Sequence, residues 1–216
     1  MTPFSWKKLS VYLIGLSLLG LSVTLIQQTN LGMSSWDALN RNFYEGIPIE
    51  YKYLNPIVAL VLVVIAYLLQ RKRFSVRMLF PLLISFYVGL VIDLLLLVIP
   101  LVAHGHWSLN LLYLFAAIII CAIGLNMVLF CRFPLPALDE LCLAIAMRLK
   151  STFGIGKLIG EIIALVLCVI SGLIFGHQAE WFYLGPTTII FTILIGPAVD
   201  LIKRPMSRLL GAAHEN

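Results

Sequence analysis

Five acidic residues lie within or beside the apolar stretches of this chain, where a carboxylate could bind an ion or a polar solute. They are Asp37, Asp93, Asp139, Glu161 and Asp200. A charged side chain near the centre of a bilayer costs about 2.5–3.5 kcal/mol on insertion scales, so it usually faces a cavity or a partner. Asp93 is the deepest of the five, because a long apolar run follows it. We therefore expect Asp93 to have a binding role.

Basic neighbours give Glu161 and Asp200 a second explanation. Glu161 follows Lys157 by one helical turn, so a local ion pair could satisfy it. Asp200 comes shortly before Lys203 and Arg204, close to the end of a predicted span. Salt bridging at the membrane surface and a binding role are therefore equal alternatives for these two acids.

Asp37 and Asp139 hold matching places in a repeated motif, because residues 31–39 (LGMSSWDAL) reappear as residues 133–141 (FPLPALDEL). Both motifs resemble helix starts, with Ser34 able to cap the first and proline suited to the beginning of the second. An aspartate in the first turn is stabilised by the helix dipole and needs no function. Its presence in both copies nevertheless favours a site where two helix N-termini face a solute or an ion.

Two further segments repeat in the same order. Residues 57–65 reappear as residues 162–170, and residues 89–94 reappear as residues 196–201. The sequence thus predicts one membrane domain over residues 1–216, built from a repeat at about 10–103 and a repeat at about 110–204. Because each repeat has three predicted spans, the second copy would lie upside down in the bilayer, as in inverted-repeat transporters.

Composition places the chain in a membrane. It has 216 residues, of which 61% are hydrophobic and 12% charged, and a mean hydropathy of +1.02. The apolar runs are too long for barrel strands, so we predict an all-α polytopic protein. Its six transmembrane helices are expected near residues 10–27, 55–70, 79–102, 110–131, 157–176 and 183–202. The net charge of +5 then reflects loop charges that set orientation, and we expect no nucleic-acid partner.

The basic residues sort to one side of these spans. Every lysine and arginine except Arg41 and Lys52 falls on the side that holds both ends of the chain. Because cytoplasmic loops carry an excess of lysine and arginine, both termini are predicted to be cytoplasmic.

The connections over residues 28–52 and 132–156 are too apolar for free loops and too short to cross a bilayer. We predict that each is a half-helix or re-entrant segment, and that the two enter from opposite faces. Such backbone is tolerated only where it is buried in protein or lines a cavity. Trp36 would then form a cavity wall, and Ser34, Asn126 and Thr187 would add polar groups to it.

The sequence gives no support for catalysis. No G-x-S-x-G, H-E-x-x-H or Walker motif occurs, and the four cysteines form no C-x-x-C pair. We therefore expect no enzyme activity, no cofactor and no metal site.

The element Leu31-Gly32-x-Ser34-x-Trp36-Asp37 resembles the "LG-x-x-P-W-D" element of the YczE/YitT/YyaS group of bacterial membrane proteins. Residues 136–139 approximate a second "P-x-D" element, and residues 185–187 with 196–197 partly match a late "G-x-G-T…G-P" segment. The chain departs at Ser35, where the group usually has proline, and it lacks the second glycine before Thr187. The resemblance implies a bacterial plasma (inner) membrane protein that transports an unspecified substrate.

These features together predict a transporter of a small polar solute, with a central site between inverted repeats. A zwitterionic, cation-coupled or proton-coupled solute is favoured, because no arginine or lysine lies inside a predicted span to hold an anion. One alternative is a non-transporting accessory protein that binds a partner protein or membrane lipid. Another is a channel, with a second copy of the chain as its partner in a homodimer.

Overall fold

The computed structural model describes residues 6–29, 31–47, 51–71, 78–102, 106–175 and 183–212, without the side chains of residues 51–55, 175 and 212. Over these residues the regular structure is helical and no strand occurs, which confirms the predicted all-α class.

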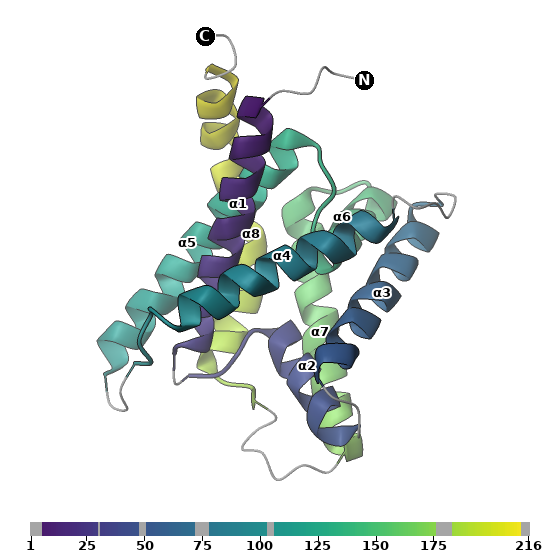
Figure 1. Cartoon of the computed structure of the whole chain (residues 1–216), viewed down its shortest axis with the longest axis vertical. Helices are drawn as coiled ribbons and strands as arrows, with labels where there is room; N and C mark the ends of the chain where they lie inside the picture. Colours follow the sequence, from purple (N-terminus) through teal and green to yellow (C-terminus); the bar gives the residue numbers. More distant parts are fainter. Residues whose placement is uncertain are drawn as a thin grey trace.

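Six long helices overlap the six predicted spans, although α4 ends before residue 102 and α8 continues past residue 202 (Figure 1). They are α1 (Trp6–Gln27), α3 (Tyr51–Leu69), α4 (Leu79–Leu96), α5 (Trp107–Cys131), α7 (Phe153–Phe175) and α8 (Pro186–Ala212). Among the described residues, all of these except α3 are long and apolar enough to cross a membrane, and the described apolar part of α3 is Pro56–Leu69. The chain is therefore a multi-pass membrane protein.

Two short helices, α2 (Ser35–Gly46) and α6 (Ala137–Leu149), occupy the two predicted re-entrant segments. The N-cap of α2 is Ser34, whose hydroxyl oxygen accepts a hydrogen bond from the Asp37 N–H at 3.2 Å. The N-cap of α6 is Pro136, and Asp139 lies in its first turn. The predicted helix starts are thus confirmed, and serine and proline begin them in different ways.

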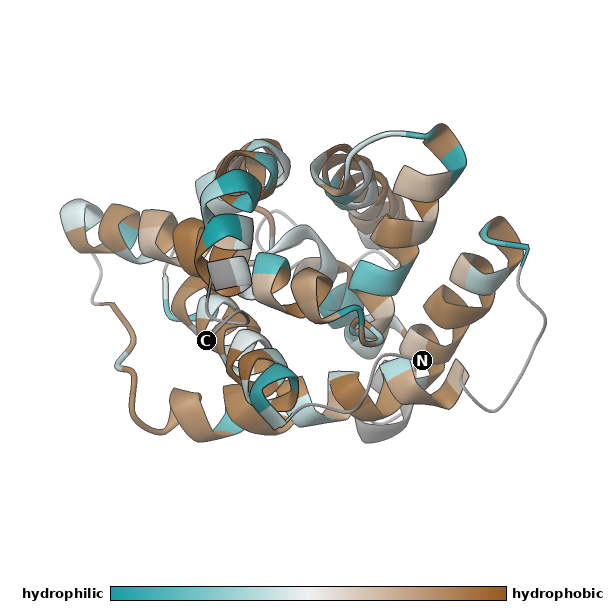
Figure 2. Cartoon of the chain, turned by 90° about the horizontal axis from the view of Figure 1, so that it is seen from above, coloured by the Kyte–Doolittle hydropathy of each residue, from teal (hydrophilic) through white to brown (hydrophobic). Residues whose placement is uncertain are grey.

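The long helices pack around a core formed mainly by α1, α5 and α8, where Leu16, Leu125 and Ile195 are fully buried. Helices α1 and α5 cross closely at two glycines. A Cβ atom added to Gly124 would lie 2.8 Å from the carbonyl oxygen of Gly15, so only a small residue fits there. Hydrophobic residues cover much of the outside of the bundle, as Figure 2 shows, and suit contact with lipid.

The chain segments that precede α2 and α8 lie against each other at the end of the bundle opposite the two termini (Figure 1). The Met33 N–H donates to the Tyr183 carbonyl at 3.1 Å, and the Thr187 N–H donates to the Leu31 carbonyl at 3.1 Å. Gly32 adopts a φ of +106°, which favours glycine, and a Cβ atom on Gly185 would lie 2.0 Å from the Leu31 carbonyl oxygen. Two glycines therefore permit this backbone contact between the halves of the chain.

Candidate functional site

A buried lysine between two carboxylates forms the most highly charged part of the interior. The Lys157 Nζ atom lies 2.9 Å from Asp139 Oδ1 and 3.1 Å from Glu161 Oε1. Lys157 is 4% exposed, Asp139 7% and Glu161 1%. We call these three residues the ion cluster. Charges withdrawn from solvent in this way require close pairing, and the two short distances provide it.

The local sequence explains how the ion cluster forms. Lys157 and Glu161 lie one turn apart on α7, so their side chains share a helix face. Asp139 comes from the first turn of α6, which packs closely on α7. Glycine makes that approach possible, because a Cβ atom on Gly156 would lie 2.3 Å from the Cys142 carbonyl oxygen and one on Gly160 would lie 2.6 Å from the Cys142 Sγ atom.

Asp37 brings a third carboxylate from the other half of the chain. It lies in the first turn of α2, and its Oδ2 atom accepts a hydrogen bond from the Ser34 hydroxyl at 2.7 Å. Lys157 of α7 and Gln27 at the end of α1 are within electrostatic range of this carboxylate. Helices α2, α6 and α7 therefore bring three carboxylates near one ammonium group, which makes the region acidic when all four groups are ionised.

Two polar atoms close to this region are buried without a hydrogen-bond partner among the described residues. They are Glu161 Oε2 and the indole nitrogen of Trp36, which packs with residues of α6 and α7 such as Leu141 and Ala164. An unpaired buried polar atom costs about 1–3 kcal/mol, so native proteins rarely leave one without a reason. The free oxygen of Glu161 is therefore available to a proton or to a ligand.

Three other predicted site residues make structural contacts, either between elements or at the start of a helix. Asn126 is buried, and its amide donates to the carbonyls of Ala122 at 2.8 Å and Val199 at 2.9 Å, which connects α5 to α8. Thr187 is buried at the contact between the segments before α2 and α8, with its Oγ1 atom 3.5 Å from that of Thr29. Ser34 caps α2 and also orients the Asp37 carboxylate.

The remaining two acids lie elsewhere. Asp93 is exposed on α4, near the end of that helix, and α4 lies on the outside of the bundle (Figure 1). Asp200 caps the start of α7, where it accepts hydrogen bonds from the Thr152 hydroxyl and from the Gly154 N–H, the latter at 3.1 Å. This capping contact is neither the salt bridge nor the binding role that the sequence suggests for Asp200. Asp200 forms no ion pair with a described residue.

Lys157 lies deeper in the protein than the sequence predicts. The sequence places it at the start of a span, among the basic residues on the cytoplasmic side, whereas α7 begins one turn earlier at Phe153. The sequence predicts its pairing with Glu161, but it does not predict its burial or its contact with Asp139. The available signal was its position among glycines and apolar residues over 154–160, which is unusual for a loop lysine.

The chain matches the family of unknown function DUF6198 over residues 6–204, and it belongs to that family. No curated protein and no solved structure matches it.

Proposed function

We propose that this member of the DUF6198 family transports a small polar solute across a bacterial plasma membrane, coupled to a proton or another cation that binds at the ion cluster. The observation that carries the proposal is the Glu161 carboxylate, which is 1% exposed and pairs through one oxygen with Lys157 while the other oxygen has no described partner. Ionisable groups inside a membrane domain are costly and usually mark proton relays or ion pathways.

The packing of the helices supports a duplicated plan, as an inverted repeat requires. Helix α2 of the first half packs on α7 of the second, and α6 of the second half packs on α3 of the first. Likewise α1 packs on α4, and α5 packs on α8. Repeats over about residues 10–103 and 110–204 would produce this exchange of partners. The ion cluster and Asp37 would then lie where the two repeats meet.

The two ends of the bundle differ in a way that suits alternating access. At the end away from the termini, the backbone contact described above is reinforced by Arg41, whose Nε atom donates to Glu45 Oε1 at 3.0 Å and whose guanidinium lies 5.5 Å from the Tyr183 ring centroid. The Tyr183 hydroxyl also donates to Glu45. At the other end, a cavity of about 480 Å³ lies between α5, α6, α7 and α8. Because this cavity does not include the residues of the ion cluster, only the packed end bears on access to them. We infer a conformation closed toward the side away from the termini.

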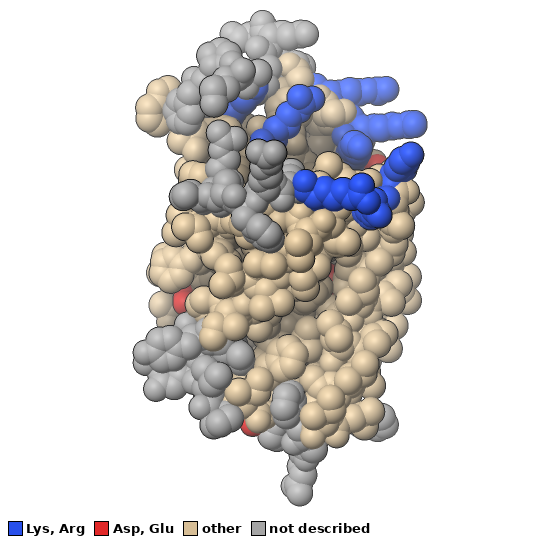
Figure 3. Space-filling view, turned by 90° about the vertical axis from the view of Figure 1, so that its right-hand side faces the viewer, with Lys and Arg blue, Asp and Glu red and all other residues tan. Residues whose placement is uncertain are grey.

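Charge distribution supports a cytoplasmic location for both termini. Figure 3 shows lysine and arginine side chains gathered at one end of the molecule. Figure 1 shows that α1 begins and α8 ends at the same end. Together with the motif around Asp37, this distribution agrees with a YczE-like protein of the bacterial inner membrane.

Proton coupling can be tested in liposomes that contain the purified protein and the pH-sensitive dye pyranine. Small zwitterionic and cationic solutes are added one at a time, and a coupled solute should change the internal pH only when the protein is present. Glu161→Gln should abolish the signal and remain folded, because the amide oxygen still accepts from Lys157. Asp93→Asn is the matched control, and it should keep the signal because Asp93 is exposed on α4.

The outcomes separate the alternatives. Steady ion conductance that does not depend on any solute would indicate a channel. If Asp37→Asn and Asp139→Asn leave both solute flux and solute-induced thermal shift unchanged, these two aspartates are not part of the binding site. If no solute gives flux in the native protein, the accessory function is favoured over transport.

A further inference from the structure

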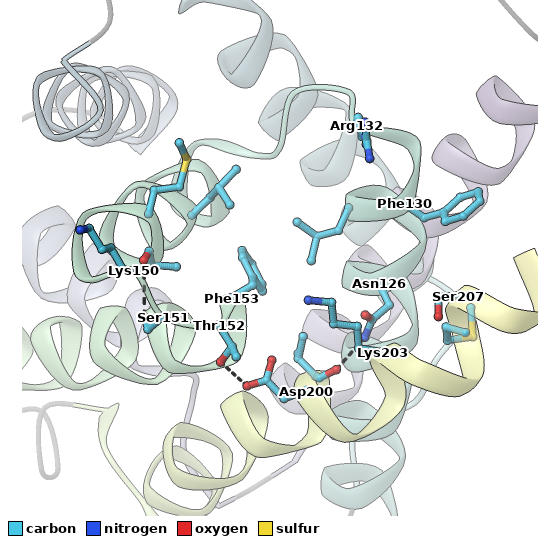
Figure 4. Close-up of a pocket in the computed structure, with 16 residues that line it drawn as sticks. Asn126, Phe130, Arg132, Lys150, Ser151, Thr152, Phe153, Asp200, Lys203 and Ser207 are labelled. Carbon is cyan, nitrogen blue, oxygen red and sulfur yellow. Dashed lines mark hydrogen bonds between the residues drawn. The ribbon is translucent and has the colours of Figure 1, made fainter. Parts of the chain in front are cut away.

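The cavity at the terminal end of the bundle has a basic border and largely apolar walls. Its lining includes Arg132 after α5, Lys150 after α6 and Lys203 of α8. In Figure 4, Lys203 extends from α8 beside Asn126 and Asp200, whereas the amino group of Lys150 points away from the cavity. Leu129, Phe130 and Met206 contribute to its apolar lining. The cavity does not include the residues of the ion cluster, so an inference about it does not depend on the proposed transport.

The charges around this cavity are unbalanced. Asp200 is its one acidic lining residue, and its two oxygens already accept from Thr152 and from the Gly154 N–H. Arg132, Lys150 and Lys203 form no ion pair with a described residue. All three are exposed, and Arg132 and Lys150 are the residues that directly follow α5 and α6, in the left-handed conformation with φ values of 57° and 52°.

Two ordinary effects explain part of this pattern. Cations at helix C-termini complement the helix dipole, and cytoplasmic ends of membrane proteins are rich in lysine and arginine. Neither effect requires basic side chains from three different helices to border one cavity of about 480 Å³ that also has an apolar wall. That combination is expected of a site for a phosphate-bearing group, since basic pockets between transmembrane helices on the cytoplasmic side bind phospholipid headgroups.

We propose that this cavity binds a phosphate group, carried either by an anionic phospholipid headgroup or by a soluble phosphate ester. Arg132 and Lys203 would contact the phosphate oxygens, with Lys150 at the edge of the site. The apolar wall would accept the first part of an acyl chain if the phosphate belongs to a lipid.

The test measures binding to the full-length protein in a neutral detergent. One arm titrates short-chain phosphatidylglycerol, and the other titrates glycerol 3-phosphate. For whichever ligand binds, Lys203→Gln and Arg132→Gln should each raise the dissociation constant about fivefold, which corresponds to about 1 kcal/mol per basic residue. The control is Arg208→Gln, which removes an exposed charge from the same end of α8 but lies outside the cavity.

Each result decides the question. Binding of the lipid but not of glycerol 3-phosphate assigns the site to a headgroup, and equal binding of both assigns it to a soluble ester. An equal loss in Arg208→Gln and Lys203→Gln would overturn the proposal, because it would show general charge attraction only. Absence of binding in both arms would overturn it as well. Thermal unfolding without added ligand should be the same for all three variants and the native protein.

Discussion

The two short helices begin with an aspartate at the same place in the repeated motif, yet the two carboxylates have different partners. Asp37 bonds to the hydroxyl of its own N-cap, Ser34, at 2.7 Å. Asp139 is bound by Lys157 of the following long helix at 2.9 Å. The first contact is local and has a neutral donor, whereas the second is an ion pair between α6 and α7. The repeated backbone plan therefore carries two chemically different sites.

The cap residue accounts for part of this difference. Serine supplies a hydroxyl that satisfies both the Asp37 N–H and the Asp37 carboxylate, whereas Pro136 makes no side-chain cap. Without a cap partner, the Asp139 carboxylate is free to pair with Lys157. The offset that aligns residues 57–65 with 162–170 also aligns Lys52 with Lys157, but the Lys52 side chain is outside the described residues. In the proposed transporter, this asymmetry would let one acid bind the coupling ion while the other helps bind the solute.

The largest expected effect comes from removing the ammonium group of the ion cluster. Lys157→Met leaves Asp139 and Glu161 buried without a cation, and breaking a buried ion pair in this way costs about 3–5 kcal/mol. We expect low yield and a much lower unfolding temperature in detergent.

A triple variant shows whether the charge is responsible for this loss. Adding Asp139→Asn and Glu161→Gln to Lys157→Met removes all three charges, and it should recover much of the stability without recovering transport. A native unfolding temperature for Lys157→Met alone would contradict the described pairing.

An intermediate effect is expected when the two aspartates are compared directly. Asp139→Asn removes a charge-assisted hydrogen bond from buried Lys157 and should lower the free energy of unfolding by about 1.5–3 kcal/mol. Asp37→Asn keeps an oxygen that accepts from Ser34 and loses only the longer-range attraction to Lys157, so its cost should be about 0.5 kcal/mol. Thermal or denaturant unfolding of the two variants in the same detergent measures the difference. Equal losses would show that the two sites are not distinct.

The sequence predicted the helices well because their signals are local. Long apolar runs define the spans, and Ser34 and Pro136 mark the two short helices that were expected as half-helices. The start of α7 was predicted too late because Asp200, far away in the sequence, caps it through Thr152 and Gly154. That tertiary contact extends α7 by one turn and places Lys157 inside the protein.

Asp93 shows a different limit. Its depth in an apolar run suggested a binding role, but α4 is apolar around its whole circumference, so its sequence does not reveal which face is covered. The packing of α4 on the outside of the bundle leaves Asp93 exposed. The predicted span continues to residue 102, whereas α4 ends at Leu96 and places Asp93 near its end. Neither the depth of this residue nor the buried face of a largely apolar helix therefore follows from the sequence alone.

A smaller effect than that of Asp139→Asn is expected from the N-cap serine, whose contacts lie within the Asp37 site. Ser34→Ala removes the hydroxyl that accepts from the Asp37 N–H and donates to its carboxylate, which should lower the free energy of unfolding by about 1 kcal/mol. Ser34→Asp is not a suitable control, because it places a second acid beside Asp37. Ser34→Thr keeps the hydroxyl and should stay close to native in thermal unfolding.

Combining Ser34→Ala with Asp37→Asn shows whether the hydroxyl and the carboxylate act as one unit. If Ser34 stabilises α2 only through the backbone cap, the losses should add, because the Asp37 N–H is the same in both backgrounds. If the hydroxyl mainly holds the carboxylate, the double variant should lose less than the sum. A non-additive result would mean that Ser34 orients Asp37 much as Lys157 orients Asp139, and the two sites would then differ in charge but share one arrangement.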